Sequence, residues 1–263
     1  MSYYDRRLQK MKLGLQLFSL IDIMNTQDGL RKVMKIAADA GYDGVEFAGF
    51  HGLTMDEVNE ELKKNNLVTA GIHLGWGSMS LEDLHNDPMA IVKDAKKIGA
   101  HSVVIPSFGG KTREEWITFA KQINEYGKMF NDSGIIFGYH NHRHEFEKFD
   151  GDYIIDILLE NCDPKNVFWE LDPRHIVIAR EDPVAFAKKY CGRVPVLHMR
   201  DIEKLTGPDT ADDTAVGSGI VDIPGVVAAS GEHQWLVVEE GPGPENEKHV
   251  FMSADYIRKT FLK

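Results

Sequence analysis

VFWELDPRH, at residues 167–175, is an apolar run that stops at the carboxylate of Asp172 and places the imidazole of His175 three residues later. A short run rich in Val and aromatic residues, bounded by polar residues, is typical of a buried β-strand. Three further runs stop at a similar side chain: IIFGYH at His140, VPVLH at His198 and WLVVE at Glu239. Four strands that each end in His, Asp or Glu favour a parallel barrel, which gathers its strand ends around one opening.

Apolar runs of this kind alternate with amphipathic segments along the whole chain, at a spacing of roughly 30 residues. The predicted strands are residues 13–18, 43–47, 68–73, 102–106, 135–140, 167–171, 194–199 and 235–239. The predicted helices are residues 27–40, 55–65, 88–98, 113–133, 152–161, 183–190, 224–230 and 253–261. Thr54, Thr112 and Asp182 each precede a segment with a helix-start signal, either acidic residues in the first turn or a proline.

The chain length agrees with this pattern. With 263 residues, the chain is close to the roughly 250 residues of a (β/α)8 TIM barrel. An open doubly wound sheet is the weaker alternative, because no G-x-G-x-x-G motif follows the first predicted strand. We therefore predict an α/β protein with a single TIM-barrel domain over residues 1–263.

The composition argues against some kinds of binding partner. The formal net charge is −11, which argues against a protein that binds nucleic acid through a basic face. No apolar stretch approaches the ~20 residues of a membrane-spanning helix, and Asp22 interrupts the first apolar segment. We expect a cytoplasmic protein with a small-molecule substrate and without a nucleic-acid or membrane partner. The oligomeric state stays open, a homo-oligomer included.

The densest polar cluster is YHNHRHEFE at residues 139–147. His140 stands at the predicted strand end, in the position that Asp172, His198 and Glu239 occupy in their own strands. His142 shares the side of His140 if the strand continues. Glu145 is far enough along the chain to fold back over the same opening. Two histidines and two carboxylates at one opening predict a divalent-metal site, because His and Asp/Glu are its usual N/O ligands.

Other polar residues follow the predicted strands and mark the same rim. Those expected to contact substrate are Gln16, Glu46, His73, Trp76, His175 and Arg200. Trp76 offers an aromatic face of the kind that packs against the C–H surface of a sugar ring.

The ordered motifs YHNH…EF, LD-x-x-H, LHMRD, GSGIVD and VVEE resemble the xylose-isomerase-like TIM barrels of the sugar phosphate isomerase/epimerase superfamily. The resemblance covers nearly the whole chain. It implies one divalent metal bound by carboxylates at strands 5 and 8, an Asp at strand 6 and a His at strand 7. In this chain the strand-8 carboxylate corresponds to Glu239, the strand-6 Asp to Asp172 and the strand-7 His to His198. At strand 5, His140 stands where the family has Glu, so either His140 is the fourth ligand or Glu145 reaches the metal. We favour His140.

The resemblance also implies an activity. The expected function is isomerisation or epimerisation of a sugar or sugar-derived carbonyl compound through a metal-stabilised enediolate, with Mn²⁺ favoured over Co²⁺, Mg²⁺ or Zn²⁺. Glu239 would move the proton on one face of the substrate, and His142 or Glu145 would serve the other face. The alternative is a lyase or dehydratase that acts on a keto-sugar derivative by the same proton abstraction. A noncatalytic sugar-binding barrel is the third reading, which the retained metal-ligand set disfavours.

The segment TGPDTADDTAVGSG at residues 206–219 lies between the last two predicted strands. It is rich in aspartate and glycine and offers little apolar surface to bury. We expect a catalytic-rim loop that substrate or a neighbouring subunit orders.

Overall fold

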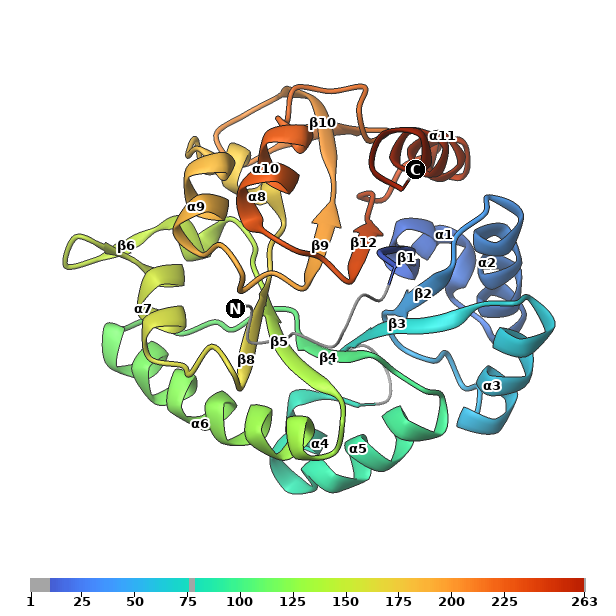
Figure 1. Cartoon of the computed structure of the whole chain (residues 1–263), viewed down its shortest axis with the longest axis horizontal. Helices are drawn as coiled ribbons and strands as arrows, with labels where there is room; N and C mark the ends of the chain where they lie inside the picture. The colour runs from blue at the N-terminus through green and yellow to red at the C-terminus, as the bar shows by residue number, and fades with distance from the viewer. Residues whose placement is uncertain (1–9, 76–78, 263) are drawn as a thin grey trace.

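Eight parallel strands form a ring in a computed structural model that describes residues 10–75 and 79–262 (Figure 1). Their order around the ring is β8-β5-β4-β3-β2-β1-β12-β9, and a parallel bridge between Leu171 and Leu197 joins the two ends. The strands are β1 (Lys12–Gln16), β2 (Gly44–Phe47), β3 (Val68–His73), β4 (Ser102–Ile105), β5 (Ile136–His140), β8 (Val167–Glu170), β9 (Val196–Met199) and β12 (Trp235–Val238). Each predicted strand is present, and the predicted TIM barrel is confirmed.

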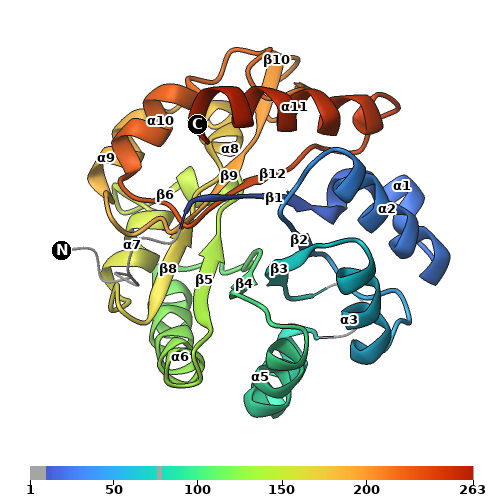
Figure 2. The ribbon, with the colours of Figure 1, turned by 45° about the vertical axis from the view of Figure 1, so that its right-hand side comes forward.

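The first and last barrel strands in the sequence are neighbours in the ring. β1 pairs in parallel with β12, and the two lie side by side in Figure 2. Helices surround the strands on the outside in every view (Figure 1). The longer ones are α2 (Gln27–Asp39), α3 (Met55–Lys64), α5 (Pro88–Lys97), α6 (Arg113–Asp132) and α11 (Asn246–Phe261). The shorter ones are α1 (Ile21–Met24), α4 (Leu81–Asn86), α7 (Ile154–Glu160), α8 (Pro173–Ile178), α9 (Pro183–Lys189) and α10 (Ile223–Ser230).

The three helix-start signals act as predicted. Thr54 forms a capping box with Glu57, and the hydroxyl of Thr112 accepts from the backbone N–H of Glu115. Asp182 caps α9, with Pro183 at the first helical position. The prediction for the last helix was too short, because α11 already begins at Asn246.

The barrel strands alternate between two environments. Outward residues such as Tyr139, Trp169 and Leu197 pack beneath the helices in the main core. Inward residues at the start of the strands form a smaller apolar cluster of Ala70, Val104, Ile136, Phe168, Val196, Trp235 and Val237. Two residues beyond three of them the strand carries a polar side chain: Glu170 follows Phe168, His198 follows Val196 and Glu239 follows Val237. The period of two along a strand therefore places the polar side chains in a layer above an apolar floor.

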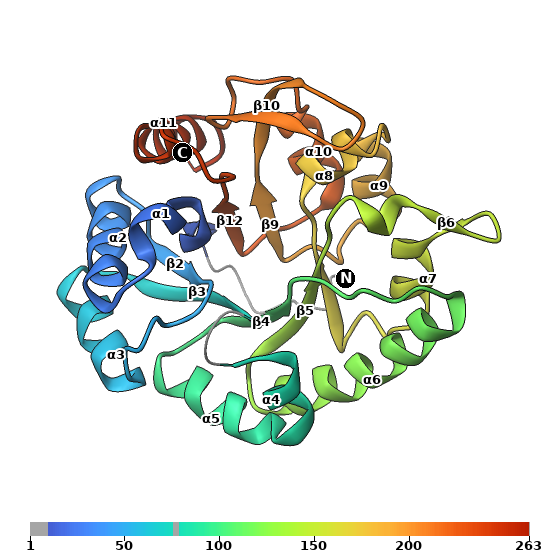
Figure 3. The same ribbon diagram turned by 180° about the vertical axis from the view of Figure 1, so that it is seen from behind.

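The segment after β9 is an ordered antiparallel hairpin of β10 (Asp201–Leu205) and β11 (Ala211–Thr214), and β10 is seen beyond the end of β9 in Figure 3. The Asp201 carboxylate accepts hydrogen bonds from the backbone N–H groups of Gly217, Gly219 and Val221. At the tip, Asp209 pairs with Arg143 at 3.1 Å. The expectation that residues 206–219 need outside contacts for order is wrong, because the chain supplies the contacts itself.

Within residues 10–75 and 79–262, no helix is both long enough and apolar enough to cross a membrane. Trp76, which we expected to contact substrate, lies outside the described residues.

Candidate metal and catalytic site

The four predicted metal-ligand residues come together at the C-terminal end of the barrel strands. His140, Asp172, His198 and Glu239 are buried, and one ligand atom from each lies within 4.8 Å of the others. Asp172 Oδ2 and His140 Nδ1 are buried without a hydrogen-bond partner in the structure. Asp172 Oδ2 has only longer contacts, 3.6 Å to Arg200 Nη1 and 3.8 Å to His175 Nε2. Buried polar atoms are normally hydrogen-bonded, so a buried carboxylate oxygen of this kind fits a site that holds a cation. We refer to these four residues as the outer cluster.

Asp172 is fixed by the start of α8. Its Oδ1 accepts from the backbone N–H groups of Arg174 and His175, at 2.8 and 3.4 Å, and this leaves Oδ2 free to face the cluster. The side-chain amide of Asn141 bonds to both the N–H and the C=O of Asp172, at 3.0 and 3.1 Å. Helix capping and the Asn141 clamp together set the direction of this carboxylate.

Glu239 follows β12, and each of its carboxylate oxygens contacts a neighbouring side chain. Its Oε1 lies 3.0 Å from Arg200 Nη1, and its Oε2 lies 2.9 Å from His198 Nδ1. Burial would raise the pKa of this carboxyl, but Arg200 and His198 outweigh it and lower the pKa to about 2. Glu239 is therefore ionised at neutral pH, as a metal ligand must be.

The other nitrogen of His198 faces inward. Nε2 lies 2.9 Å from Glu46 Oε2 and 3.2 Å from Glu170 Oε2, and Gln16 Nε2 donates to Glu46 Oε2 at 2.8 Å. A carboxylate on one imidazole nitrogen fixes the tautomer and leaves the other nitrogen for a metal. Glu46 and Gln16, which we expected to bind substrate, are thus placed in the buried layer behind His198.

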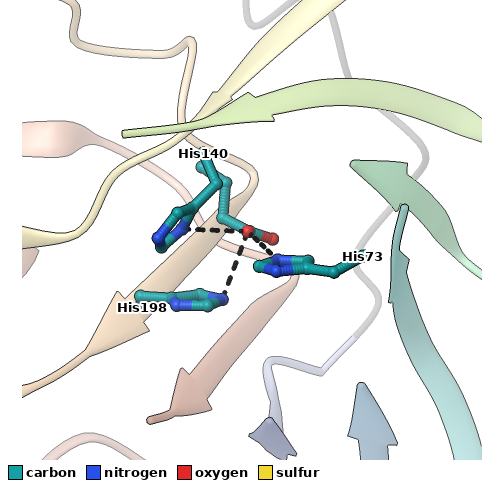
Figure 4. Close-up of side chains that lie close together, drawn as sticks. His73, His140 and His198 are labelled. Carbon is teal, nitrogen blue, oxygen red and sulfur yellow. Dashed lines mark hydrogen bonds and ion pairs between the residues drawn. The ribbon is translucent and has the colours of Figure 1, made fainter. Parts of the chain in front are cut away.

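Glu170 belongs to this site, and the sequence analysis missed it. Its Oε2 lies 2.6 Å from His73 Nε2, 3.3 Å from His140 Nδ1 and 3.2 Å from His198 Nε2, and Figure 4 shows the carboxylate oxygen among the three imidazoles. Glu170 stands two residues before Asp172 in WELD, so the period of a strand places it on the same inward face. That spacing was the available signal, and the apolar run around Glu170 obscured it.

Glu145 is placed elsewhere. Tyr139 donates its hydroxyl to Glu145 Oε1 at 2.5 Å, and the backbone N–H of His142 donates to Oε2 at 2.9 Å. Because Tyr139 points outward into the helix layer, these bonds hold Glu145 away from the outer cluster. Glu145 is not among the residues whose ligand atoms meet in the outer cluster, whereas His140 is, so the structure favours His140 as the strand-5 ligand.

His142 and His175 lie beside His140 on the side of the opening. Ring centroids are 5.0 Å apart for His140–His142 and 4.7 Å for His142–His175. Burial lowers the pKa of His142 to about 4 and lowers the pKa of His175 as well. Both imidazoles are therefore neutral near pH 7, and either can accept a hydrogen bond or a proton there.

Arg200 is held by more than one carboxylate. Besides Glu239, it contacts Asp213 of β11 at 3.2 Å and Asp172 at 3.6 Å, and its Nη1 lies 3.5 Å from His175 Nε2. The guanidinium thus ties the hairpin to the outer cluster. Sequence reasoning selected Arg200 but not Asp213, because the pairing across the hairpin brings residue 213 to the site.

The chain is similar in sequence to known enzymes. Two relatives are inosose dehydratases. The one from Clostridium botulinum (strain Alaska E43 / Type E3) is 26% identical over 78% of this chain and 80% of the relative. The one from Clostridium tetani (strain Massachusetts / E88) is 28% identical over 51% of this chain, a match that spans about half, 49%, of the relative. The expectation of an enzyme in the isomerase, epimerase or lyase range is confirmed at this level.

Solved structures share the fold. A sugar phosphate isomerase/epimerase from Parabacteroides distasonis ATCC 8503 superposes with a TM-score of 0.78 at 23% identity, over 98% of this chain and 96% of that one. The IolI protein with a bound zinc atom superposes with a TM-score of 0.73 at 16% identity, over 96% and 100%. The model of the xylose isomerase-like TIM barrel family matches residues 34–260. The chain belongs to this family.

Proposed function

We propose that the protein is a divalent-metal-dependent enzyme that removes a proton next to the carbonyl of a cyclic keto-sugar derivative and then expels water. The observation that carries this is the outer cluster, where two buried carboxylates, one with an oxygen that has no hydrogen bond, converge with two imidazoles. Elimination is favoured over isomerisation because the curated relatives at 24–28% identity are inosose dehydratases. Isomerisation or epimerisation is the second candidate, supported by the Parabacteroides structure.

A divalent ion, for which we propose Mn²⁺, would supply Lewis-acid polarisation of the substrate carbonyl and so acidify the neighbouring C–H. The chain would hold it through His140, Asp172, His198 and Glu239. Glu46 would keep the His198 ring in the tautomer that offers Nδ1 to the ion.

The two candidate proton carriers differ in their contacts. Both oxygens of Glu239 are engaged by His198 and Arg200. Burial lowers the pKa of His142 to about 4, which leaves a neutral imidazole beside the cluster. We assign proton removal to His142 and a ligand role to Glu239, with His175 and Arg200 orienting substrate oxygens.

The test uses a matched pair of aspartates. Asp172 and Asp182 both cap a helix that begins with proline, but only Asp172 faces the cluster. The metal-stripped protein would be reconstituted with Mn²⁺, Co²⁺, Mg²⁺ or Zn²⁺ and assayed on a keto-inositol in deuterated solvent. Asp172→Asn should lose metal and activity, and Asp182→Asn should keep both.

Product analysis then separates the candidates. Loss of water gives an unsaturated or diketone product and supports the dehydratase, whereas deuterium at an inverted carbon without water loss supports the epimerase. Turnover without metal, or equal metal content in Asp172→Asn and the wild type, would refute the proposal.

A further inference from the structure

Two glutamates are fully buried behind the outer cluster. Glu46 on β2 and Glu170 on β8 both have 0% exposure. Their ion-pair partners among the described residues are histidines and no Lys or Arg: His73 and His198 for both carboxylates, and His140 for Glu170. Buried carboxylates need a positive partner, because removing a charge from water is costly.

The atoms surround a small volume. Glu170 Oε2 lies 2.6 Å from His73 Nε2, and Glu46 Oε2 lies 3.2 Å from the same nitrogen. Ligand atoms at about 2.0–2.1 Å from a tetrahedral ion stand roughly 3.3 Å apart. The His73–Glu46 spacing already suits an ion, and the His73–Glu170 spacing would have to widen by about 0.7 Å. His73, Glu170, His140 and His198 also form a group whose ligand atoms lie within 4.8 Å of one another (Figure 4).

The second oxygen of each carboxylate has no hydrogen-bond donor. Glu46 Oε1 and Glu170 Oε1 are buried without a hydrogen-bond partner. Gly71 makes room for the first of them, since a Cβ at that position would lie 2.4 Å from Glu46 Oε1. Each carboxylate thus has one oxygen toward His73 and a second oxygen with no protein donor, which suits a carboxylate that binds a metal.

The His198 ring separates this volume from the outer cluster. Its Nδ1 faces Glu239 and its Nε2 faces Glu46 and Glu170, while the His73 ring stacks on it at 5.4 Å with an interplanar angle of 1°. The two groups of side chains are therefore adjacent: Glu239 lies at one edge of this imidazole and Glu46 and Glu170 at the other, and His140 contacts Glu170 directly at 3.3 Å.

We propose that His73, Glu46 and Glu170 form a second, inner divalent-cation site, so that the protein binds two ions per chain. A divalent ion between two carboxylates and a neutral imidazole balances the buried charge, which protons on His73, His198 or Glu170 otherwise balance. The N/O ligand set suits Zn²⁺ or Mn²⁺. This inner site goes beyond the proposed reaction, which requires only the ion of the outer cluster.

The experiment measures metal stoichiometry of the whole chain without substrate. Chelator-treated protein is titrated with Zn²⁺ or Mn²⁺ alone by calorimetry, and the bound metal is counted by elemental analysis. The wild type should bind two equivalents. Glu170→Gln and His73→Gln should each bind one, while Asp172→Asn should lose the other. Glu145→Gln, a buried glutamate outside both sites, should keep two.

The outcomes separate this proposal from the proposed function. One equivalent in the wild type that Asp172→Asn removes and Glu170→Gln leaves unchanged would overturn the inner site and keep the outer one. One equivalent that only the inner variants remove would overturn the outer site and the two-ion proposal together. Electron paramagnetic resonance of the Mn²⁺-loaded wild type gives a readout that needs no variant. Spin-coupled pairs support two adjacent ions, and an isolated-ion spectrum at saturation contradicts them.

Discussion

At the scale of single residues, the site depends on which atom of each side chain is already occupied. One oxygen of Asp172 accepts the hydrogen bonds of its helix cap and the other accepts none, whereas both oxygens of Glu145 accept hydrogen bonds, from Tyr139 and His142. Both residues are acidic and follow a strand in sequence. Their difference arises from local hydrogen bonds that the sequence pattern does not reveal, which is why the sequence left Glu145 open as an alternative ligand.

Asp213 offers a prediction at this scale, because it contacts Arg174, Arg200 and the backbone N–H of Gly241. Asp213→Ala should lower the free energy of unfolding by about 1–3 kcal/mol, since charged hydrogen bonds are lost in a partly buried place. Asp212→Ala in the same strand, where the aspartate pairs with Lys204 at the surface, should cost about 0–1 kcal/mol. Chemical denaturation measures both, and equal losses would contradict the role given to Asp213.

His233 gives a pH prediction away from the site. Burial lowers the pKa of His233 in the folded protein, while the unfolded residue titrates near 6.5. The unfolded state therefore binds the proton first, and the free energy of unfolding should fall as pH decreases below about 6.5. His233→Gln should remove this part of the slope. Parallel pH–stability curves for the wild type and His233→Gln would show that the imidazole does not contribute.

At the scale of elements, strand positions follow from the sequence because apolar runs and their polar ends are local signals. The hairpin of β10 and β11 and the segment after it do not, because Asp201 at the start of β10 binds backbone N–H groups of residues 217, 219 and 221, which are 16–20 positions away. Segments α1, α4 and α8 are helices of 4–6 residues that were not predicted, since so short a helix carries little periodicity.

The packing inside the barrel gives the prediction at this scale. A Cβ at Gly138 on β5 would lie 2.5 Å from the ring of Phe168 on the adjacent β8. Gly138→Ala should therefore destabilise the protein by about 1–3 kcal/mol through overpacking. Gly109→Ala is the control, because no atom lies within 4 Å of a Cβ built there. Thermal unfolding compares the two variants. An unchanged unfolding temperature in Gly138→Ala would mean that the residues around Gly138 rearrange to accept the extra methyl group.

At the scale of the whole molecule, parallel strand ends bring together residues that are distant in sequence. His140 and Glu239 are separated by 99 positions (239 minus 140) and meet in one cluster. The sequence could predict this meeting because a TIM barrel gathers all strand ends at one opening. It selected Glu46 and His73 only as substrate contacts and missed Glu170, because the shared contact of both carboxylates with His73 appears only in three dimensions.

The central claim is that the outer cluster binds a divalent ion. Crystals soaked in Mn²⁺ and measured at the manganese absorption edge test it most directly. The account predicts an anomalous peak within bonding distance of Asp172 Oδ2, His198 Nδ1 and a Glu239 oxygen, and no peak there in Asp172→Asn crystals treated in the same way. An empty outer cluster in fully soaked wild-type crystals, or an outer peak that persists in Asp172→Asn, would contradict it.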